Sequence, residues 1–240
     1  MEEEDLLGLL DSEEKPFQEA DKKPANKPFN KSGTGGNDLW SKTEFTPKKL
    51  NLTDMKRSGK SFTIYYQTSS KDVPDDAKEK LIKFAKALIS KGYVFRHNGS
   101  PEDGIQNAIL TLDGCVSQTY LPWKKFNINI KEPYLDRCTE DAYSVAFNNH
   151  KVFSKLPPTV RCILSRDVHV LTGKNVNDPV DVVFTYSKAG HEAITKNVDY
   201  KELGSLSFIY RVIQDLNVTV FNVKNDDASN RLLEYLKNVN

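Results

Sequence analysis

The chain has 240 residues, 38% of them hydrophobic, so it is long enough to bury one sizeable core and need not form two domains. Its 34 basic residues almost balance its 33 acidic residues, and the formal net charge of +1 argues against indiscriminate binding to nucleic acid. The three cysteines, Cys115, Cys138 and Cys162, are odd in number and lack a metal-ligand spacing, so we expect reduced thiols and no zinc site.

The sequence does not predict a membrane partner. No apolar stretch approaches the roughly 18 residues of a membrane span. Met1 is followed by acidic residues from Glu2 to Asp5, where a signal peptide would be basic. We therefore expect a cytoplasmic protein, and we expect it to need neither a cofactor nor a metal.

Residues 1 to 58 have the composition of a disordered tail. The first 21 residues hold nine carboxylates and one lysine, whereas residues 22 to 60 hold ten basic and three acidic residues, so the sign of the charge reverses. The segment is rich in Lys, Asn, Pro, Gly and Ser and has too little apolar surface to offset the entropy of ordering.

Two short apolar peptides in this tail are candidates for docking to a protein partner. They comprise Leu6, Leu7, Leu9 and Leu10 in one, and Leu39, Trp40 and Phe45 in the other. A frayed acidic terminus is the alternative for the first peptide. Packing onto the protein's own domain is the alternative for the second.

From residue 59 onward, strand and helix patterns alternate. Strands are expected over residues 61–68, 93–95, 116–122, 179–187 and 217–223. Helices are expected over residues 74–92, 101–114, 139–149, 158–171, 205–214 and 226–236. This order predicts an α/β fold, a Rossmann-like three-layer sandwich with a mostly parallel sheet, over residues 59–240.

Four turns of such a fold have the chemistry of a ligand site, because ligands collect where the carboxyl ends of parallel strands meet helix starts. Their polar and glycine residues are Ser69, Ser70 and Lys71; Arg96, Asn98, Gly99, Ser100 and Asp103; Ser187; and Gly204 and Ser205. Small polar residues also cap helices without binding a ligand, so each turn alone is weak evidence.

Several longer segments follow one another in an order that resembles a known family. They are YYQTSSKDVPDDAKEKLIKFAKALISKGYVFRHNGSPEDG, YLPWKKFN, KLPPTVRCILSRDVHVLTG, DPVDVVFTYSKAG and VTVFNV. Over roughly residues 60 to 237 the chain resembles phage-encoded members of the SLOG superfamily, relatives of DNA-processing protein A and of the Lonely Guy nucleotide hydrolases. The resemblance implies an accessory protein of the host cytoplasm that binds or senses a nucleotide or ADP-ribose-type ligand and recruits a partner through its tail.

The resemblance also implies roles for the residues of the turns. Ser70 and Lys71 would hold one phosphate, and Arg96, Asn98 and Gly99 a second phosphate or the sugar. Asp103 would bind a ribose hydroxyl, and Ser187, Gly204 and Ser205 would close the site. On this basis Lys71→Ala and Arg96→Ala are each expected to cost about 1.5 to 3 kcal/mol of binding.

The departures from the family pattern argue against full activity. Ser69-Ser70-Lys71 stands where the family has G-S-R, and Glu102 adds a negative charge to a turn that has lost one glycine. The stretch LGSLSFIYR lacks the glutamate of the family motif P-G-G-x-G-T-x-x-E. We therefore expect a protein that is non-catalytic or only weakly catalytic, although Asp103, Glu192 and His191 remain candidates for a general acid or nucleophile.

Three other functions stay open at this stage. The first is a nucleotide N-glycoside hydrolase. The second is a single-stranded DNA-binding protein that uses Lys124, Lys125 and the basic part of the tail. The third is an adaptor that binds no ligand and acts through protein-protein contacts of its tail.

Overall fold

The computed structural model describes residues 45–195, 198 and 200–239. Its five strands form one sheet in which every pairing is parallel, in the order β3-β2-β1-β4-β5. The strands are β1 (Ser61–Tyr66), β2 (Val94–His97), β3 (Ser117–Thr119), β4 (Val182–Tyr186) and β5 (Thr219–Asn222). The predicted α/β fold with a parallel sheet is confirmed, and each of the five expected strands is present.

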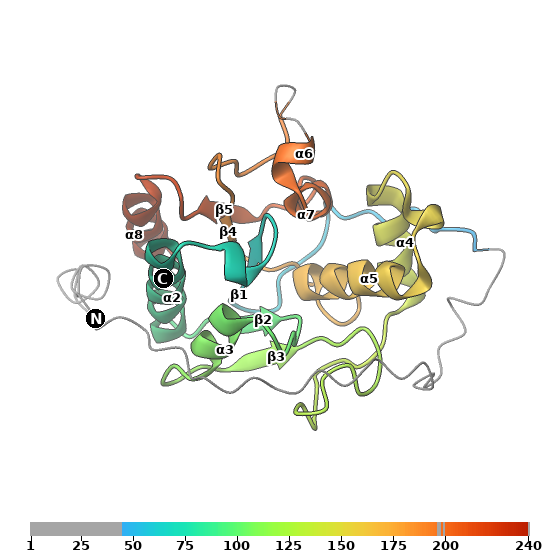
Figure 1. The fold of residues 1–240 in the computed structure, drawn as a ribbon, viewed down its shortest axis with the longest axis horizontal. Helices are drawn as coiled ribbons and strands as arrows, with labels where there is room; N and C mark the ends of the chain where they lie inside the picture. The colour runs from blue at the N-terminus through green and yellow to red at the C-terminus, as the bar shows by residue number, and fades with distance from the viewer. Residues whose placement is uncertain (1–44, 196–197, 199, 240) are drawn as a thin grey trace.

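Helices cover both faces of this sheet (Figure 1). One face packs against α2 (Asp75–Ser90), α3 (Gly104–Leu110) and α8 (Ala228–Asn238). The other face packs against α5 (Pro158–Thr172) and α7 (Leu206–Ile213), and α4 (Glu140–Asn149) packs against these two helices. Three short elements complete the order: η2 (Ser70–Asp72), η3 (Phe153–Lys155) and α6 (Tyr200–Leu203).

The two central strands are buried along their whole length. All six residues of β1 and all five of β4 are buried, as expected for strands covered on both faces. Along β1, Phe62, Ile64 and Tyr66 face the first layer of helices, and Tyr65 faces the second. This alternation places Tyr65 and Tyr66 on opposite faces of the sheet at the carboxyl end of the strand.

Helix α3 is shorter than the sequence predicts. Its first residue is Gly104 rather than Pro101, because the side chain of Asp103 accepts a hydrogen bond from the backbone N–H of Gln106 and so caps the helix at residue 103. Helix α6 was not predicted, since four residues are too few to show a helical period.

Residues 45–58, which the composition assigns to the tail, lie against the folded domain. The ring of Phe45 meets that of Tyr143 edge to face with centroids 4.6 Å apart, and Leu52 is buried. The backbone N–H and the hydroxyl of Ser58 both donate to Asp178 at 2.7 Å. For Phe45, the structure therefore shows packing on the protein's own domain.

The remaining candidates for partner docking lie outside the described residues. They are Leu6, Leu7, Leu9, Leu10, Leu39 and Trp40.

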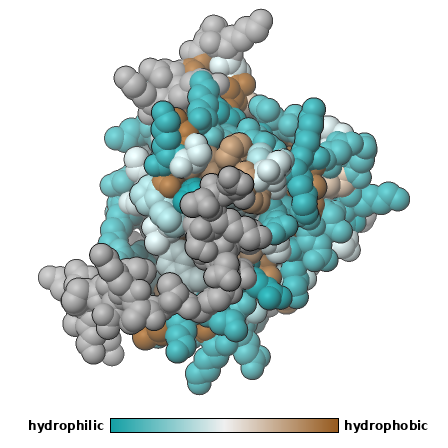
Figure 2. Space-filling model, turned by 90° about the vertical axis from the view of Figure 1, so that its right-hand side faces the viewer, coloured by the Kyte–Doolittle hydropathy of each residue, from teal (hydrophilic) through white to brown (hydrophobic). Residues whose placement is uncertain are grey.

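Within the described part of the chain, no helix combines the length and the apolar character needed to cross a membrane. The face beside α4 and α5 is mainly hydrophilic, with scattered hydrophobic residues (Figure 2).

Candidate functional site

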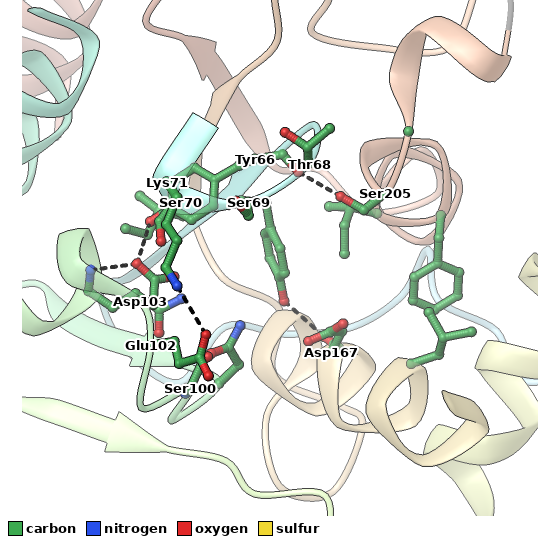
Figure 3. A pocket seen from close by; sticks show the side chains of 18 of the residues that line it. Tyr66, Thr68, Ser69, Ser70, Lys71, Ser100, Glu102, Asp103, Asp167 and Ser205 are labelled. Carbon is green, nitrogen blue, oxygen red and sulfur yellow. Dashed lines mark hydrogen bonds and ion pairs between the residues drawn. The ribbon is translucent and has the colours of Figure 1, made fainter. Parts of the chain in front are cut away.

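A cavity of about 580 Å³ opens at the carboxyl ends of β1 and β2. It reaches down between the end of the sheet, α5 and the start of α7 (Figure 3). Its lining residues are Ile64, Tyr65, Tyr66, Thr68, Ser69, Ser70, Lys71, Asn98, Ser100, Glu102, Asp103, Gln106, His150, Leu164, Asp167, Gly204, Ser205, Ser207, Phe208 and Ile209.

The position of the cavity follows from the order of the strands. From β1 the chain moves outward through β2 to β3, and then returns to place β4 and β5 on the other side of β1. The connections leaving β1 and β4 therefore run in opposite directions, which opens a crevice above the carboxyl end of β1. In parallel α/β folds this topological switch point is the usual place for a ligand.

Eight of the eleven predicted ligand-binding residues line this cavity. They are Ser69, Ser70, Lys71, Asn98, Ser100, Asp103, Gly204 and Ser205. They come from three separate segments of the chain, which the parallel sheet brings together. The other three, Arg96, Gly99 and Ser187, do not line it.

Arg96 points away from the cavity, toward the turn that precedes β4. Its guanidinium donates to the carboxylate and to the carbonyl oxygen of Asp178, and its Nε donates to Gln118 at 3.1 Å. The side chain is 4% exposed. The expected role of Arg96 in holding a phosphate thus has to be corrected, because its charge is paired with Asp178.

The turn after β2 offers a ligand few free backbone donors. The N–H of Gly99 donates to Nδ1 of His97 at 3.3 Å, and the N–H of Ser100 donates to Oδ1 of Asn98 at 3.0 Å. Gly99 has φ +63°, and a Cβ there would collide with the side chain of Leu121. This glycine is required by packing, and the turn does not present the anion-binding nest that the sequence predicts.

Ser187 is fully buried at the end of β4. Its hydroxyl oxygen accepts a hydrogen bond of 2.8 Å from Nδ2 of Asn222 on β5. This bond ties together the ends of two neighbouring strands. Ser187 therefore has a structural role rather than the predicted role of closing the site.

A salt bridge spans two of the loops that form the cavity wall. Nζ of Lys71, in η2, lies 3.2 Å from Oε2 of Glu102, in the turn before α3 (Figure 3). Both side chains are about two-thirds exposed, at 70% and 68%. Exposed pairs of this kind contribute little to stability, so the contact opens at low cost when another group competes for Lys71.

Asp103 is a buried carboxyl in the cavity wall. Its Oδ1 accepts hydrogen bonds from the hydroxyl of Tyr66 at 3.2 Å and from the N–H of Gln106 at 3.0 Å, and Ser70 also bonds to this carboxyl. Burial raises the pKa of Asp103 above the ordinary value of an aspartate, against the opposing effect of these donors. The carboxyl is therefore suited to bonding a neutral, hydroxyl-bearing group.

Asp167 lies on α5, within the cavity (Figure 3). Burial raises its pKa, and the neighbouring guanidinium of Arg166 opposes that shift by donating to Oδ1 at 2.8 Å. The hydroxyl of Tyr65 donates to the carbonyl oxygen of Asp167 at 3.4 Å, joining β1 to α5.

Two polar atoms of the lining residues have no hydrogen-bond partner within the described structure. They are Oε1 of Gln106 and Nδ1 of His150. Gln106 is 2% exposed. Burial lowers the pKa of His150, and the charge of Arg211 adds to that effect, so the ring is neutral. Unsatisfied buried polar groups are uncommon in folded proteins, and here they border a cavity that can hold a ligand.

The start of α7 is held against the end of β1. The hydroxyl of Ser205 donates to the carbonyl oxygens of Tyr66 at 2.6 Å and of Gln67 at 3.1 Å. Gly204 has φ +53°, and a Cβ at this position would collide with the carbonyl oxygen of Gln67. The predicted residues Gly204 and Ser205 thus shape the cavity and line it.

Of the three candidates for a general acid or nucleophile, only Asp103 lines the cavity. Glu192 is held by Arg231 and accepts the N–H of Asn222 at 2.7 Å. His191 lies 3.7 Å from the carboxylate of Glu202. No group of three or more potential metal ligands occurs among the described residues.

Sequence reasoning missed several residues of the cavity, chiefly Tyr65, Tyr66, Gln106 and Asp167. The two tyrosines looked like ordinary strand residues, but their place at the carboxyl end of the first strand was a usable signal. Gln106 and Asp167 lie on helices whose orientation toward the cavity no local pattern reveals.

Comparison with known proteins gives no match. The chain matches none of the protein-family models, and neither the curated proteins nor the solved structures include one with significant similarity to it. The resemblance to the SLOG superfamily therefore stays a prediction that depends on the quoted sequence motifs.

Proposed function

We propose that this protein binds a nucleotide-type ligand in the cavity at the carboxyl ends of β1 and β2, and acts as an accessory or sensing protein. The observation that carries the proposal is the convergence of three polar segments at the topological switch point of a parallel sheet. A volume of about 580 Å³ is in the range of small-molecule sites.

The lining offers separate surfaces for the parts of such a ligand. Tyr65, Tyr66 and Phe208 supply aromatic area for a base, and Asp103 supplies an acceptor for sugar hydroxyls. Lys71, with the hydroxyls of Ser69 and Ser70 nearby, is the place for a single phosphate. Arg96 and Gly99 have no part in this arrangement.

Calorimetry and thermal shift of the full chain test the proposal. The probes are ribonucleosides, their 5′-phosphates and ADP-ribose. We expect saturable binding of at least one probe, abolished by Ser207→Trp, which fills the cavity from the start of α7. Ser207→Ala is the matched control and should retain binding. If no probe binds, or if the Ser207→Trp variant binds a probe as tightly as the unmodified protein does, the proposal is refuted.

An N-glycoside hydrolase is the second candidate, and the state of Asp103 is what favours it. A buried carboxyl with a raised pKa, hydrogen-bonded by Tyr66 inside a cavity, has the properties of a general acid. Chromatography of any bound probe after incubation would detect a released base. Asp103→Asn, which can still cap α3, should abolish that release while leaving the fold intact.

The tail remains a proposed site for a protein partner, through its first apolar peptide. Binding experiments with the full chain and with a chain lacking residues 1–44 would separate this role from ligand binding.

A further inference from the structure

The described residues that line the cavity include more acidic than basic side chains. Three of them bear carboxyl groups, Glu102, Asp103 and Asp167, and Lys71 is the one lysine or arginine among them. His150 adds no charge, since its ring is neutral. A ligand with several phosphates would therefore bring like charge close to this wall.

Two cations at the cavity are already engaged. Lys71 pairs with Glu102 across the two loops. Arg166 donates twice to Asp167 and, at 3.4 Å, to the carbonyl oxygen of Asn98. One phosphate can take Lys71 from Glu102, but a second and a third phosphate would find no further lysine or arginine among the described lining residues.

The wall also holds an acceptor that lacks a donor. Oε1 of Gln106 has no hydrogen-bond partner within the described structure, although its residue is almost fully buried. The backbone N–H of the same residue donates to the carboxyl of Asp103 at the start of α3. A hydroxyl or amino group of a ligand would supply the missing donor.

We propose that this cavity selects ligands with uncharged hydrogen-bond donors, such as ribonucleosides and their monophosphates, over nucleoside diphosphates and triphosphates. Glu102 disfavours additional phosphates by occupying Lys71, and Gln106 accepts a donor from the sugar or the base. This inference rests on the nucleotide-type function proposed above, and it names the ligand class within that function.

A purely structural role of Gln106 and a role in binding the ligand predict different effects of a substitution by leucine. If the side chain only fills space beside α3, a leucine of similar size preserves both stability and binding. If it accepts a donor from the ligand, leucine preserves stability and loses binding. Removing an acceptor that has no partner should leave the unliganded fold at least as stable as before.

The test is calorimetric titration of the full chain with adenosine, guanosine, cytidine and uridine, and with the 5′-monophosphate and 5′-triphosphate of each. For the base that binds, we expect the Kd of the triphosphate to be at least tenfold higher than that of the nucleoside. Glu102→Gln should lower the ratio of the triphosphate Kd to the nucleoside Kd at least threefold. Glu132→Gln, an exposed residue outside the cavity, is the matched control and should leave the ratio unchanged.

Gln106→Leu should raise the Kd of the nucleoside at least fivefold while the unliganded thermal midpoint stays equal or rises. A triphosphate that binds as tightly as the nucleoside, or a leucine variant with unchanged affinity, would overturn this inference and leave the proposed function standing. Absence of binding by every probe would overturn the proposed function itself, and this inference with it.

Discussion

The hydroxyl of Ser205 donates a hydrogen bond of 2.6 Å to the carbonyl oxygen of Tyr66, so the start of α7 is fixed on the last residue of β1. The N–H of Ser205 also donates to Gln67 at 3.0 Å. Two segments almost 140 residues apart in the chain thereby form one wall of the cavity. The shape of the cavity depends on this junction.

Gly204→Ala should disrupt the junction. The residue has φ +53°, and a Cβ there would collide with the carbonyl oxygen of Gln67. We expect the free energy of unfolding to fall by about 2 kcal/mol, as for other strained left-handed residues. Chemical denaturation measures the change. Gly59→Ala is the control, because nothing lies within 4 Å of a Cβ at that position; equal stability of the two variants would contradict the prediction.

Arg96→Met should reduce stability and leave ligand affinity unchanged. The substitution removes the partner of Asp178 from a site where the arginine side chain is 4% exposed, and breaking a buried pair costs about 3 to 5 kcal/mol. Denaturation and calorimetry on the same preparation separate the two effects. Lys71→Ala should show the reverse pattern, since Lys71 lines the cavity and is exposed. Weaker binding in a stably folded Arg96 variant would restore Arg96 to the site.

Acid should destabilise the fold through two neutral histidines. Burial lowers the pKa of His97 and of His169 from 6.5 to about 4. Nε2 of His169 accepts the N–H of Thr139 at 3.2 Å, and a proton on that nitrogen would break the bond. Nδ1 of His97 likewise accepts the N–H of Gly99.

The direction follows from proton linkage. Between pH 6.5 and about 4 the unfolded chain binds more protons at these histidines than the folded protein does, so the free energy of unfolding falls as the pH falls. Each histidine contributes up to about 3 kcal/mol. The buried carboxyls of Asp103 and Asp167, whose pKa values are raised, act in the opposite direction. Denaturation at pH 7, 5.5 and 4.5 should show a shallower loss in His169→Gln; an unchanged slope would contradict the assignment.

Phe45→Ala should loosen residues 45–58 from the domain. The ring packs edge to face on Tyr143 and also contacts Phe147, so its removal should cost about 2 to 3 kcal/mol for a partly buried aromatic. Limited proteolysis would report faster cleavage between residues 45 and 58. Thr46→Ala, at an exposed neighbour, is the control. Equal cleavage rates in the two variants would show that Phe45 does not hold the segment on the domain.

The sequence predicted the fold well where periodicity and burial agree. Strands β1 and β4 are continuous buried runs, and α2 has a clear apolar face with Gly92 just beyond its end. The sequence places the start of α3 three residues too early, because both a proline and a capping aspartate are typical of a helix start. The order of the strands then determines which loops lie together at the cavity.

The site was predictable only in part, because the sequence indicates where strands end but does not indicate which distant residues a side chain contacts. Lys71 and Asp103 follow strand ends and reach the cavity, as their positions suggested. Arg96 lies within β2 and faces Asp178, a partner 82 positions later that no local pattern could reveal. No sequence pattern distinguishes Gln106, whose side-chain oxygen has no hydrogen-bond partner within the described structure.

The central place of β1 has a consequence for how the chain folds as it is synthesised. Phe62 of β1 pairs with Phe95 of β2 on one side and with Val182 of β4 on the other, 120 positions later. At translation rates of about 5 to 20 residues per second, one edge of β1 stays open for on the order of ten seconds before β4 emerges from the ribosome. An open, apolar strand edge invites pairing with other chains, so this protein should depend on chaperones more during synthesis than after it.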